Sequence, residues 1–284
     1  MMEPAMIVAF QGELGAYSEE AVRRTFPSAE LQPTATFEDI FAAVEDGAAD
    51  RAVVPIENTV FGSVHVNYDH LQAHDVEIVG EVHLRIRHHL LAPAGASLQT
   101  LRTVRSHPQA LGQCRAWLRE HLPDVATEPM YDTAGAAREV ADADDLSVAA
   151  IAARQAADRY DLDVLASGLE DNPENYTRFL VLARTGSGAE RVGEGALKTS
   201  IVFTLRQNVP GALFKSLAVF ALRDLDLLKI ESRPYVGHPG RYRFFLDVVG
   251  DGTQPPLTRA LANLREVSTE VQRLGTYPAA DRET

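Results

Sequence analysis

The chain contains very little cysteine and a shortage of positive charge. Cys114 is the single cysteine among 284 residues, so no disulfide can form within the chain and we expect a reducing, cytoplasmic environment. Lys and Arg number 27 against 40 Asp and Glu, and the formal net charge is −13. Because this charge repels polyanions and the basic residues form no block, we expect neither nucleic acid nor an anionic membrane as a partner.

Long apolar runs, metal motifs and nucleotide motifs are absent as well. No run approaches the ~18 residues that span a bilayer, and the first ten residues do not resemble a signal peptide. Six histidines could suggest a metal site, namely His65, His70, His74, His83, His88 and His89. They come without an HExxH motif, a cysteine pair or a carboxylate cluster, so we expect no metal. The glycines complete no dinucleotide-binding fingerprint, so we expect no cofactor. Hydrophobic residues still make up 45% of the chain, which is typical of a folded protein.

Residues 1–185 alternate short apolar runs with segments of helical periodicity. This alternation predicts an α/β region with a largely parallel sheet. The long run at residues 76–92 is a plausible crossing segment between two lobes, approximately residues 1–80 plus 165–185 and residues 81–164. A ligand would then bind between the lobes, at the ends of the strands.

The remainder of the chain has a different order. Residues 186–196 are rich in glycine and are expected to form a linker. Residues 197–278 read as strand, helix, strand, strand, helix, strand, which is the ferredoxin-like βαββαβ order. Such a module, with one covered sheet face, often pairs with a copy of itself.

The most informative segment begins a predicted strand after a turn-rich loop. Thr177, Arg178 and Phe179 place a neutral proton donor, a cation and an aromatic ring together. This combination suits a reaction in which an anionic small molecule is held while a hydroxyl group leaves. An alternative for Arg178 is a solvent-exposed position or a pair with Glu174.

Three predicted helices begin after strands with a small hydroxyl residue, at Ser18, Ser106 and Thr133. Free backbone N–H groups make each helix start a potential carboxylate site, although each residue could be only an N-cap. Gln109 and Gln113 lie four residues apart, opposite an apolar stripe, and either face a ligand or form a solvated surface.

Asn58 follows Glu57 at the end of a predicted buried strand, where α/β proteins place functional loops. A carboxylate repels an anionic substrate, so we expect Glu57 to make structural hydrogen bonds. In the C-terminal module, Asn208 to Gly211 form a tight loop before a helix whose N–H groups could receive the carboxylate of an effector.

Several motifs occur in one order along the chain and together resemble those of the prephenate dehydratase family. They are Phe10-Gln11-Gly12, Gly15-Ala16-Tyr17-Ser18, Val54-Pro55-Ile56-Glu57-Asn58, Ser106-His107-Pro108-Gln109-Ala110-Leu111, Gln113-Cys114, Asn175-Tyr176-Thr177-Arg178-Phe179, Gly211-Ala212-Leu213 and Glu231-Ser232-Arg233-Pro234.

The resemblance implies a two-lobed catalytic region similar to periplasmic binding proteins, followed by an ACT regulatory domain that binds L-phenylalanine, in a homodimer or homotetramer. It implies the conversion of prephenate to phenylpyruvate, water and carbon dioxide, with Thr177 as the catalytic residue. The expected substrate contacts are Tyr17, Ser18, Asn58, Ser106, Gln109, Gln113, Thr133, Arg178 and Phe179. The expected effector contacts are Asn208, Gly211, Ala212, Leu213, Glu231, Ser232, Arg233 and Pro234.

Three positions depart from the family pattern, namely Glu13, Ala16 and Thr59. They lie in the substrate loops and leave open whether prephenate or its amino analogue arogenate is preferred. A third alternative is a non-catalytic, two-lobed sensor of an aromatic metabolite. Loss of water and carbon dioxide from prephenate forms an aromatic ring, so the reaction is strongly favourable in free energy. The enzyme therefore requires only an acid and groups that bind the substrate.

Overall fold

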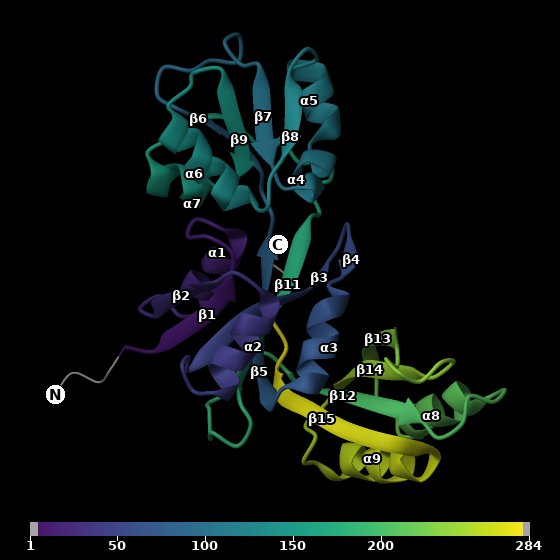
Figure 1. Cartoon of the computed structure of the whole chain (residues 1–284). Coiled ribbons are helices and arrows are strands. Elements are labelled where there is room, and N and C mark those ends of the chain that lie inside the picture. Colours follow the sequence, from purple (N-terminus) through teal and green to yellow (C-terminus); the bar gives the residue numbers. More distant parts are fainter. Residues whose placement is uncertain (1–4, 281–284) are drawn as a thin grey trace. The chain divides into compact units, whose positions relative to one another are not determined.

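The computed structural model describes residues 5–280, which form two compact units (Figure 1). The first unit comprises the described residues up to His70 together with Val82–Phe179, and the second comprises Leu71–Glu81 and the described residues from Leu180 onwards. The predicted domain boundary at residues 186–196 lies inside the second unit and stays a prediction. No helix within residues 5–280 is both long and apolar enough to cross a bilayer.

The first lobe is built on a six-stranded sheet in the order β2-β1-β3-β11-β5, with β4 paired to β3. Its strands are β1 (Ile7–Gln11), β2 (Glu30–Thr34), β3 (Arg51–Asn58), β4 (Gly62–Ser63), β5 (Val76–Arg85) and β11 (Tyr176–Arg184). Its helices are α1 (Tyr17–Thr25), α2 (Phe37–Glu45) and α3 (His65–Ala73). The middle residues of β1 and β3 are fully buried on both faces, as expected for parallel strands covered by helices.

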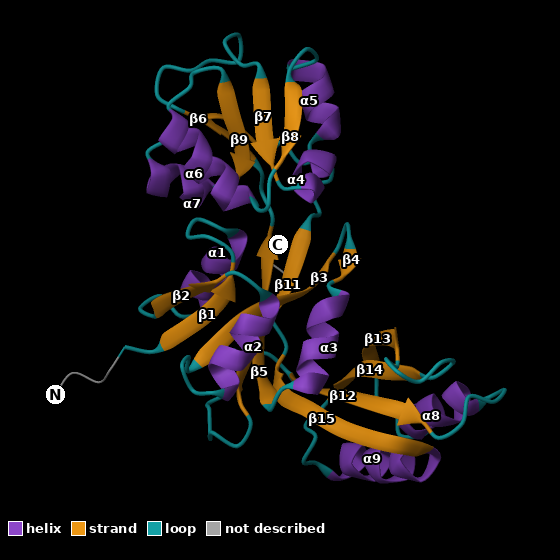
Figure 2. Cartoon of the chain, viewed as in Figure 1, coloured by secondary structure: helices purple, strands orange, loops and turns teal. Residues whose placement is uncertain are grey.

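The second lobe is a five-stranded sheet in the order β10-β6-β9-β7-β8, with helices on both faces (Figure 2). Its strands are β6 (His89–Ala92), β7 (Thr103–Ser106), β8 (Ala126–Pro129), β9 (Val148–Ala152) and β10 (Asp163–Ser167). Its helices are α4 (Pro108–Gln113), α5 (Arg115–His121), α6 (Thr133–Ala143) and α7 (Arg154–Tyr160). Alternate residues of β6 and β9 enter opposite cores: Leu90 and Ile151 pack under α4 and α5, whereas Leu91 and Ala150 pack under α6 and α7.

Both lobes are α/β, as the strand and helix alternation predicted, but the sheets are mixed. β6, through which the chain enters the second lobe, runs antiparallel to both of its neighbours, β9 and β10. The single helix expected from Ser106 onwards is two short helices that meet at Cys114, whose backbone leaves the helical conformation. The apolar stripe expected there still packs, with Cys114, Leu118 and Leu122 buried in one core.

The C-terminal part of the second unit has the βαββαβ order that the sequence predicted. Its elements are β12 (Leu197–Leu205), α8 (Ala212–Ala221), β13 (Leu227–Pro234), β14 (Tyr242–Val249), α9 (Pro255–Val267) and β15 (Ser268–Pro278). The sheet order is β13-β14-β12-β15, and all pairs are antiparallel. Ile201, Phe203, Phe244 and Leu246 form one face of the sheet and pack against residues of α8 and α9.

The opposite face of this sheet carries a buried polar network with residues of β5. Lys198 Nζ lies 2.7 Å from a carboxylate oxygen of Glu81, and both side chains are almost fully buried. Asp247 lies 3.9 Å from the same ammonium group and accepts a hydrogen bond from Ser200. Glu81 also accepts the backbone N–H of Ala280. Such buried charges are tolerated because each has an opposite charge or a donor beside it.

Candidate active site

A cavity of about 520 Å³ is lined by residues from both lobes of the first unit. It lies where the loops after β1 and β3, the start of β11 and the starts of α4 and α6 converge. The cavity lining includes the predicted catalytic residue Thr177 and six of the predicted substrate contacts, Tyr17, Asn58, Gln109, Gln113, Thr133 and Phe179. These seven residues come from five separate segments, so the fold brings together residues that are far apart in the sequence.

The Thr177 side chain lies in the cavity with a defined orientation of its hydrogen bonds. Asn58 Nδ2 donates to Thr177 Oγ1 over 3.0 Å and to Asn175 Oδ1 over 2.8 Å. The Asn58 amide cannot be reversed, because its Oδ1 already accepts the backbone N–H groups of Val60 and Phe61. Thr177 Oγ1 is therefore an acceptor from Asn58, which leaves its own proton available for a ligand.

The loop around Asn58 is fastened to the start of β11. Thr59 Oγ1 donates to the carbonyl of Glu174 and accepts the N–H of Tyr176, at 2.7 and 2.9 Å. The Thr59 N–H donates to the Tyr176 carbonyl. These bonds fix the backbone on both sides of the contact between Asn58 and Thr177, so the Thr177 hydroxyl is held in place before any ligand binds.

The cavity lining carries an acidic side chain, that of Asp132, together with backbone N–H groups near the helix starts. Among the described residues that line it there is no Lys or Arg, and the two histidines, His88 and His107, have pKa values lowered mainly by burial. The starts of α1, α4 and α6 reach the lining through Tyr17, Gln109 and Thr133. The Gln109 N–H donates to the His107 side chain and the Gly135 N–H to the Asp132 side chain, whereas the other N–H groups of each first turn have no partner within the helix. The helix starts are therefore the groups of the lining that can attract an anion, and the carboxylate of Asp132 opposes them.

Three predicted substrate contacts do not line the cavity. Arg178 is buried, but it alternates with Thr177 and Phe179 along β11 and so lies on the other side of the strand. Ser106 is fully buried at the end of β7, where its hydroxyl donates to the carbonyl of Ile151. Ser18 is the second residue of α1 and is buried behind Tyr17.

The predicted helix starts are also displaced by one or two residues. Ala16, His107 and Asp132 occupy the N-cap positions that the sequence suggested for Ser18, Ser106 and Thr133. His107 and Asp132 cap their helices with side-chain hydrogen bonds to backbone N–H groups. The shift moves Thr133 to the first helical residue, where both it and Asp132 line the cavity.

His88 is a lining residue that the sequence did not single out, except as a metal candidate. The His88 side chain lies at the back of the cavity, and Nδ1 and Nε2 are 2.8 Å from the Tyr17 hydroxyl and 2.6 Å from Gln113 Oε1. Its backbone N–H donates to Glu170. Burial raises the pKa of the Tyr17 hydroxyl well above its usual value, so the phenol stays protonated. Nowhere in the described chain do three or more His, Cys, Asp or Glu residues gather to hold a metal ion.

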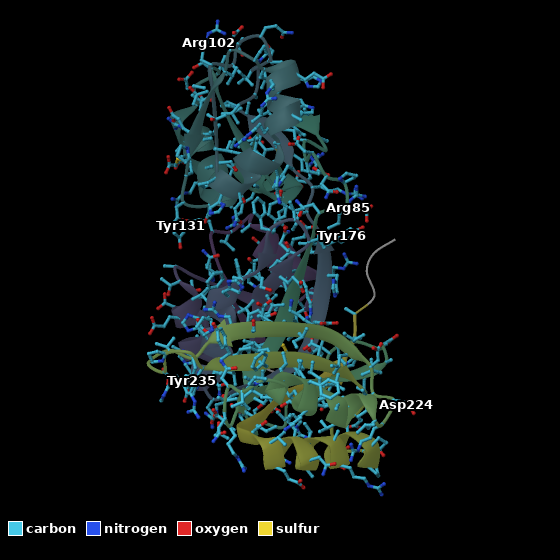
Figure 3. All side chains as sticks on the ribbon, turned by 90° about the vertical axis from the view of Figure 1, so that its right-hand side faces the viewer. Arg85, Arg102, Tyr131, Tyr176, Asp224 and Tyr235 are labelled. Carbon is cyan, nitrogen blue, oxygen red and sulfur yellow. The ribbon has the colours of Figure 1, made fainter. Side chains whose placement is uncertain are left out.

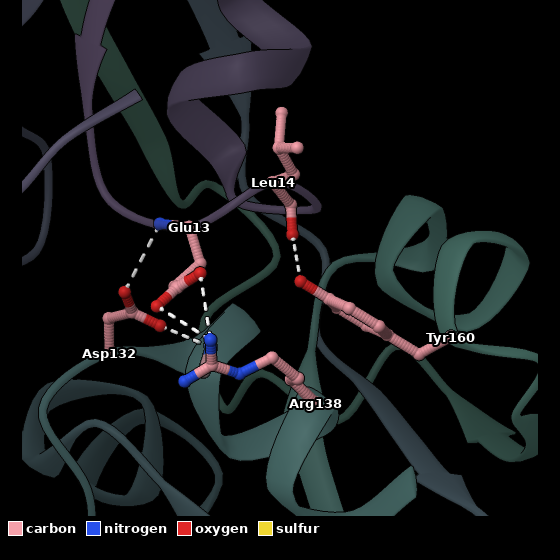
Figure 4. Close-up of polar contacts among 6 residues, drawn as sticks. Glu13, Leu14, Asp132, Arg138 and Tyr160 are labelled. Atoms are coloured by element: carbon pink, nitrogen blue, oxygen red, sulfur yellow. Dashed lines mark hydrogen bonds and ion pairs between the residues drawn. The ribbon is translucent and has the colours of Figure 1, made fainter. Parts of the chain in front are cut away.

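The two lobes touch beside the cavity through the loop after β1 (Figure 4). Tyr160 donates to the Leu14 carbonyl over 2.6 Å, and Glu13 pairs with Arg138 at 3.3 Å and, through its N–H, with Asp132. Gly15 lies so close to α7 that an added Cβ would stand 3.1 Å from Ala156 Cα. Because Glu13 and Arg138 are both about 40% or more exposed, the ion pair contributes little, and the close packing and the Tyr160 bond matter more.

Tyr131 of the second lobe, which is labelled in Figure 3, lines the cavity and makes a further contact with the first lobe. Its hydroxyl donates to the Ala35 carbonyl over 2.6 Å and accepts from Gln11 at 3.3 Å, although 70% of the residue is exposed. The structure therefore holds the two lobes together at several points around the lining.

The predicted effector residues cluster in the second unit at the start of α8 and the end of β13. Gly211 is the N-cap of α8 and has a φ of +80°, a conformation that suits glycine. Asn208 donates to the Gly240 carbonyl, and Lys229 lies 3.7 Å from Glu231 on the same strand. Ser232 and Pro234 are exposed, whereas Glu231 and Arg233 are half-buried.

A family model described as prephenate dehydratase matches residues 8–187, well over half of the chain, and covers the whole cavity lining. The chain belongs to the prephenate dehydratase family. This prephenate dehydratase homologue is 45% identical over 282 residues to arogenate dehydratase/prephenate dehydratase 2, chloroplastic, of Arabidopsis thaliana, covering 95% of the chain and 72% of that relative.

Solved structures agree with this assignment. The prephenate dehydratase of Arthrobacter aurescens, solved in complex with L-Phe, superposes with a TM-score of 0.89 at 35% identity and covers 98% of this chain and 92% of its own. A protein described as a novel type of quorum-quenching acylase matches with a TM-score of 0.88 at 35% identity, covering 96% and 98% of the two chains. The fold of this prephenate dehydratase homologue is therefore shared by proteins with different reported activities.

Proposed function

We propose that this protein converts prephenate to phenylpyruvate, water and carbon dioxide. The observation that carries the proposal is the Thr177 hydroxyl, which accepts a hydrogen bond from Asn58 and keeps its own proton free within the cavity. Membership of the prephenate dehydratase family supports the same activity, which makes the protein a carbon–oxygen lyase.

The reaction requires one bond to the ring carboxylate and one bond to the ring hydroxyl to break. The electron pair of the carbon–carbon bond moves into the ring as carbon dioxide leaves, and the ring expels hydroxide from its opposite carbon. One proton taken up from solvent completes the water molecule, so atoms and charge balance. Thr177 donates a hydrogen bond to the leaving oxygen, and assistance of this class contributes about 10²–10⁴-fold.

Backbone N–H groups hold the two substrate carboxylates in this proposal. The starts of α1 and α6 supply them, with the side chains of Gln109 and Thr133 beside them. We assign no substrate contact to Arg178, Ser106 or Ser18, because none of them belongs to the lining. Phe179 and the apolar residues around it exclude water from the ring, which strengthens every electrostatic contact.

Arogenate is the second candidate substrate, because the Arabidopsis relative is named for both activities. Acylase chemistry is disfavoured by the site geometry: an acylase that uses Thr177 as its nucleophile needs a base at the hydroxyl, and the neighbour of Thr177 Oγ1 is the N–H donor of Asn58. The sensor alternative has the same cavity and differs only in the absence of turnover.

The test is an assay of the purified protein with prephenate and, in parallel, with arogenate, comparing kcat/KM. Thr177→Val, which keeps the shape and removes the hydroxyl, should lower kcat by about 10²–10⁴-fold with the fold intact by circular dichroism. Thr177→Ser, the matched control, retains the hydroxyl and should keep far more activity. Wild-type turnover in Thr177→Val would remove Thr177 from the mechanism, and no turnover by the wild type would favour a sensor.

Regulation by L-phenylalanine is part of the proposal. The complex of the Arthrobacter relative with L-Phe, the βαββαβ order and the predicted contacts Asn208, Gly211 to Leu213 and Glu231 to Pro234 support an effector site in the second unit. Exposed apolar residues on the same module, including Phe214 at 75% and Ile230 at 47%, support pairing with a second copy of the chain. Adding L-phenylalanine to the prephenate assay, with the mass in solution measured, tests both points.

The cellular location remains a prediction. A single buried cysteine and the absence of a membrane-spanning helix from residues 5–280 are compatible with the cytoplasm. The Arabidopsis relative is named as chloroplastic.

A further inference from the structure

The His88 ring makes hydrogen bonds to both lobes, and the directions of these bonds depend on which ring nitrogen carries the proton. The ring joins the two lobes: Nδ1 faces the Tyr17 hydroxyl at the start of α1, and Nε2 faces the Gln113 side chain at the end of α4. The Tyr17 hydroxyl has a second neighbour, the carbonyl of Arg87, also at 2.8 Å. Because the ring is buried and neutral, it carries one proton, on either nitrogen.

In the first arrangement, the proton is on Nε2 and is donated to the Gln113 oxygen. Nδ1 and the Arg87 carbonyl are then both acceptors, and the single proton of Tyr17 can serve only one of them. The Gln113 amide turns its NH₂ group away from His88. Since Gln113 lines the cavity, the cavity then gains a hydrogen-bond donor.

In the second arrangement, the Gln113 amide is rotated by half a turn, so that its oxygen and nitrogen exchange places and the other heavy atoms stay where they are. The NH₂ group donates to Nε2, Nδ1–H donates to the Tyr17 hydroxyl, and the hydroxyl donates to the Arg87 carbonyl. Every donor and acceptor in this series of hydrogen bonds then has a partner. The Gln113 oxygen faces away from His88, so the cavity gains an acceptor. The two arrangements differ by one hydrogen bond, so a ligand that supplies the matching partner can select either.

We propose that His88 and Gln113 act together as the specificity-determining pair that matches the cavity to a keto or an ammonium group on the substrate side chain. This inference rests on the proposed dehydratase function. Prephenate presents a keto oxygen, which needs a donor, and arogenate presents an ammonium group, which needs an acceptor. A side chain that can act either as donor or as acceptor accommodates both substrates, whereas a side chain limited to one of these roles discriminates strongly between them. His88 is a positioning residue, because it acts through Gln113.

The test replaces Gln113 by a side chain that can only accept. In Gln113→Glu, one carboxylate oxygen accepts from His88 Nε2–H and the other faces the cavity. The ratio of kcat/KM for arogenate to that for prephenate should rise about tenfold or more relative to the wild type. Gln109→Glu is the matched control: it adds the same charge to the same helix and the same cavity, away from His88, and should shift the ratio much less.

A second variant covers the case in which the added charge prevents folding. Gln113→Met keeps the length of the side chain without donor or acceptor and should lower kcat/KM for both substrates. An arogenate-to-prephenate ratio that moves no further in Gln113→Glu than in Gln109→Glu would overturn the inference, as would wild-type efficiency of Gln113→Met with both substrates. Turnover by the wild type decides the proposed function separately, so an active wild type with an unchanged ratio contradicts this inference alone.

Discussion

At the scale of single residues, the cavity depends on side chains whose hydrogen-bonding direction is forced by their neighbours. Asn58 shows this most clearly, because two backbone donors on its oxygen oblige its nitrogen to face Thr177. A threonine hydroxyl is a weak acid and serves in catalysis only when its proton points at the leaving group. In the mechanism that we propose, the surrounding loop sets that orientation before the reaction begins.

His88 gives a prediction about stability and pH. Burial lowers the His88 pKa, although its contact with Gln113 and the charge of Glu170 act in the opposite direction. An unfolded histidine takes up a proton near pH 6.5, where the folded ring stays neutral, so the unfolded state binds more protons and stability falls as the pH drops below about 6.5. Above about pH 6.5, His88 no longer makes the free energy of unfolding depend on pH.

We therefore expect the free energy of unfolding to decline between pH 7.5 and pH 5, and to decline less in His88→Gln, measured by urea unfolding at several pH values. The slope with pH is the readout, because the substitution also changes packing. His121→Gln, at an exposed position stacked on Trp117, is the control for loss of a histidine. Equal slopes for wild type and His88→Gln would exclude His88 as a source of the pH dependence.

At the scale of elements, the loop between β1 and α1 does two things at once. It begins a helix whose first N–H groups reach the cavity, and it carries the glycine that lets α7 approach. Gly15 has a φ of +97° and stands against Ala156, so both its backbone conformation and its lack of a side chain are used. Contact between the lobes at this point lies beside the cavity whose lining residues come from both lobes.

Gly15→Ala should consequently raise KM for the substrate as well as lower stability. A left-handed backbone costs an alanine about 1–2 kcal/mol, and the 3.1 Å contact adds a force that separates the lobes. Gly95→Ala is the matched control, since Gly95 also has a positive φ but nothing within 4 Å of the added Cβ. Steady-state kinetics together with thermal unfolding separate the effects, and an equal KM in the two variants would contradict a role for Gly15 in lobe contact.

At the scale of the whole molecule, β5 and β11 each contribute residues to both compact units. β5 passes from the second unit into the first between Glu81 and Val82, and β11 passes from the first into the second between Phe179 and Leu180. Thr177 and Glu81, the partner of the buried Lys198, are thus close in sequence to the two points at which the chain changes unit.

Removing one charge of that pair should destabilise the whole chain. Lys198→Met leaves Glu81 buried without its cation, which costs about 3–5 kcal/mol, and Glu81→Gln added to it should restore much of the loss. Because β5 belongs to both units, we expect urea unfolding to shift in circular dichroism and also in the fluorescence of Trp117, the single tryptophan, which lies in the first unit. A fluorescence transition that stays in place would show that the units unfold independently.

The sequence by itself determined the fold class, the βαββαβ order and the family, because these depend on local periodicity and on short motifs in a fixed order. It also placed Thr177, Asn58, Gln109, Gln113 and Thr133 among the candidate site residues, and all five line the cavity. The exact starts of the helices were harder to predict, because a neighbouring histidine or aspartate can be the N-cap in place of the expected serine or threonine.

Only the tertiary structure decided which side of a strand or helix faces the cavity. Arg178 and Thr177 are adjacent in sequence and lie on opposite sides of β11, while His88 and Tyr17, 71 residues apart, share a hydrogen bond. The antiparallel insertion of β6 and the break between α4 and α5 at Cys114 likewise follow from packing against segments distant in sequence. Local patterns record the propensity of each segment, but the direction of a side chain is fixed by the neighbours that folding brings to it.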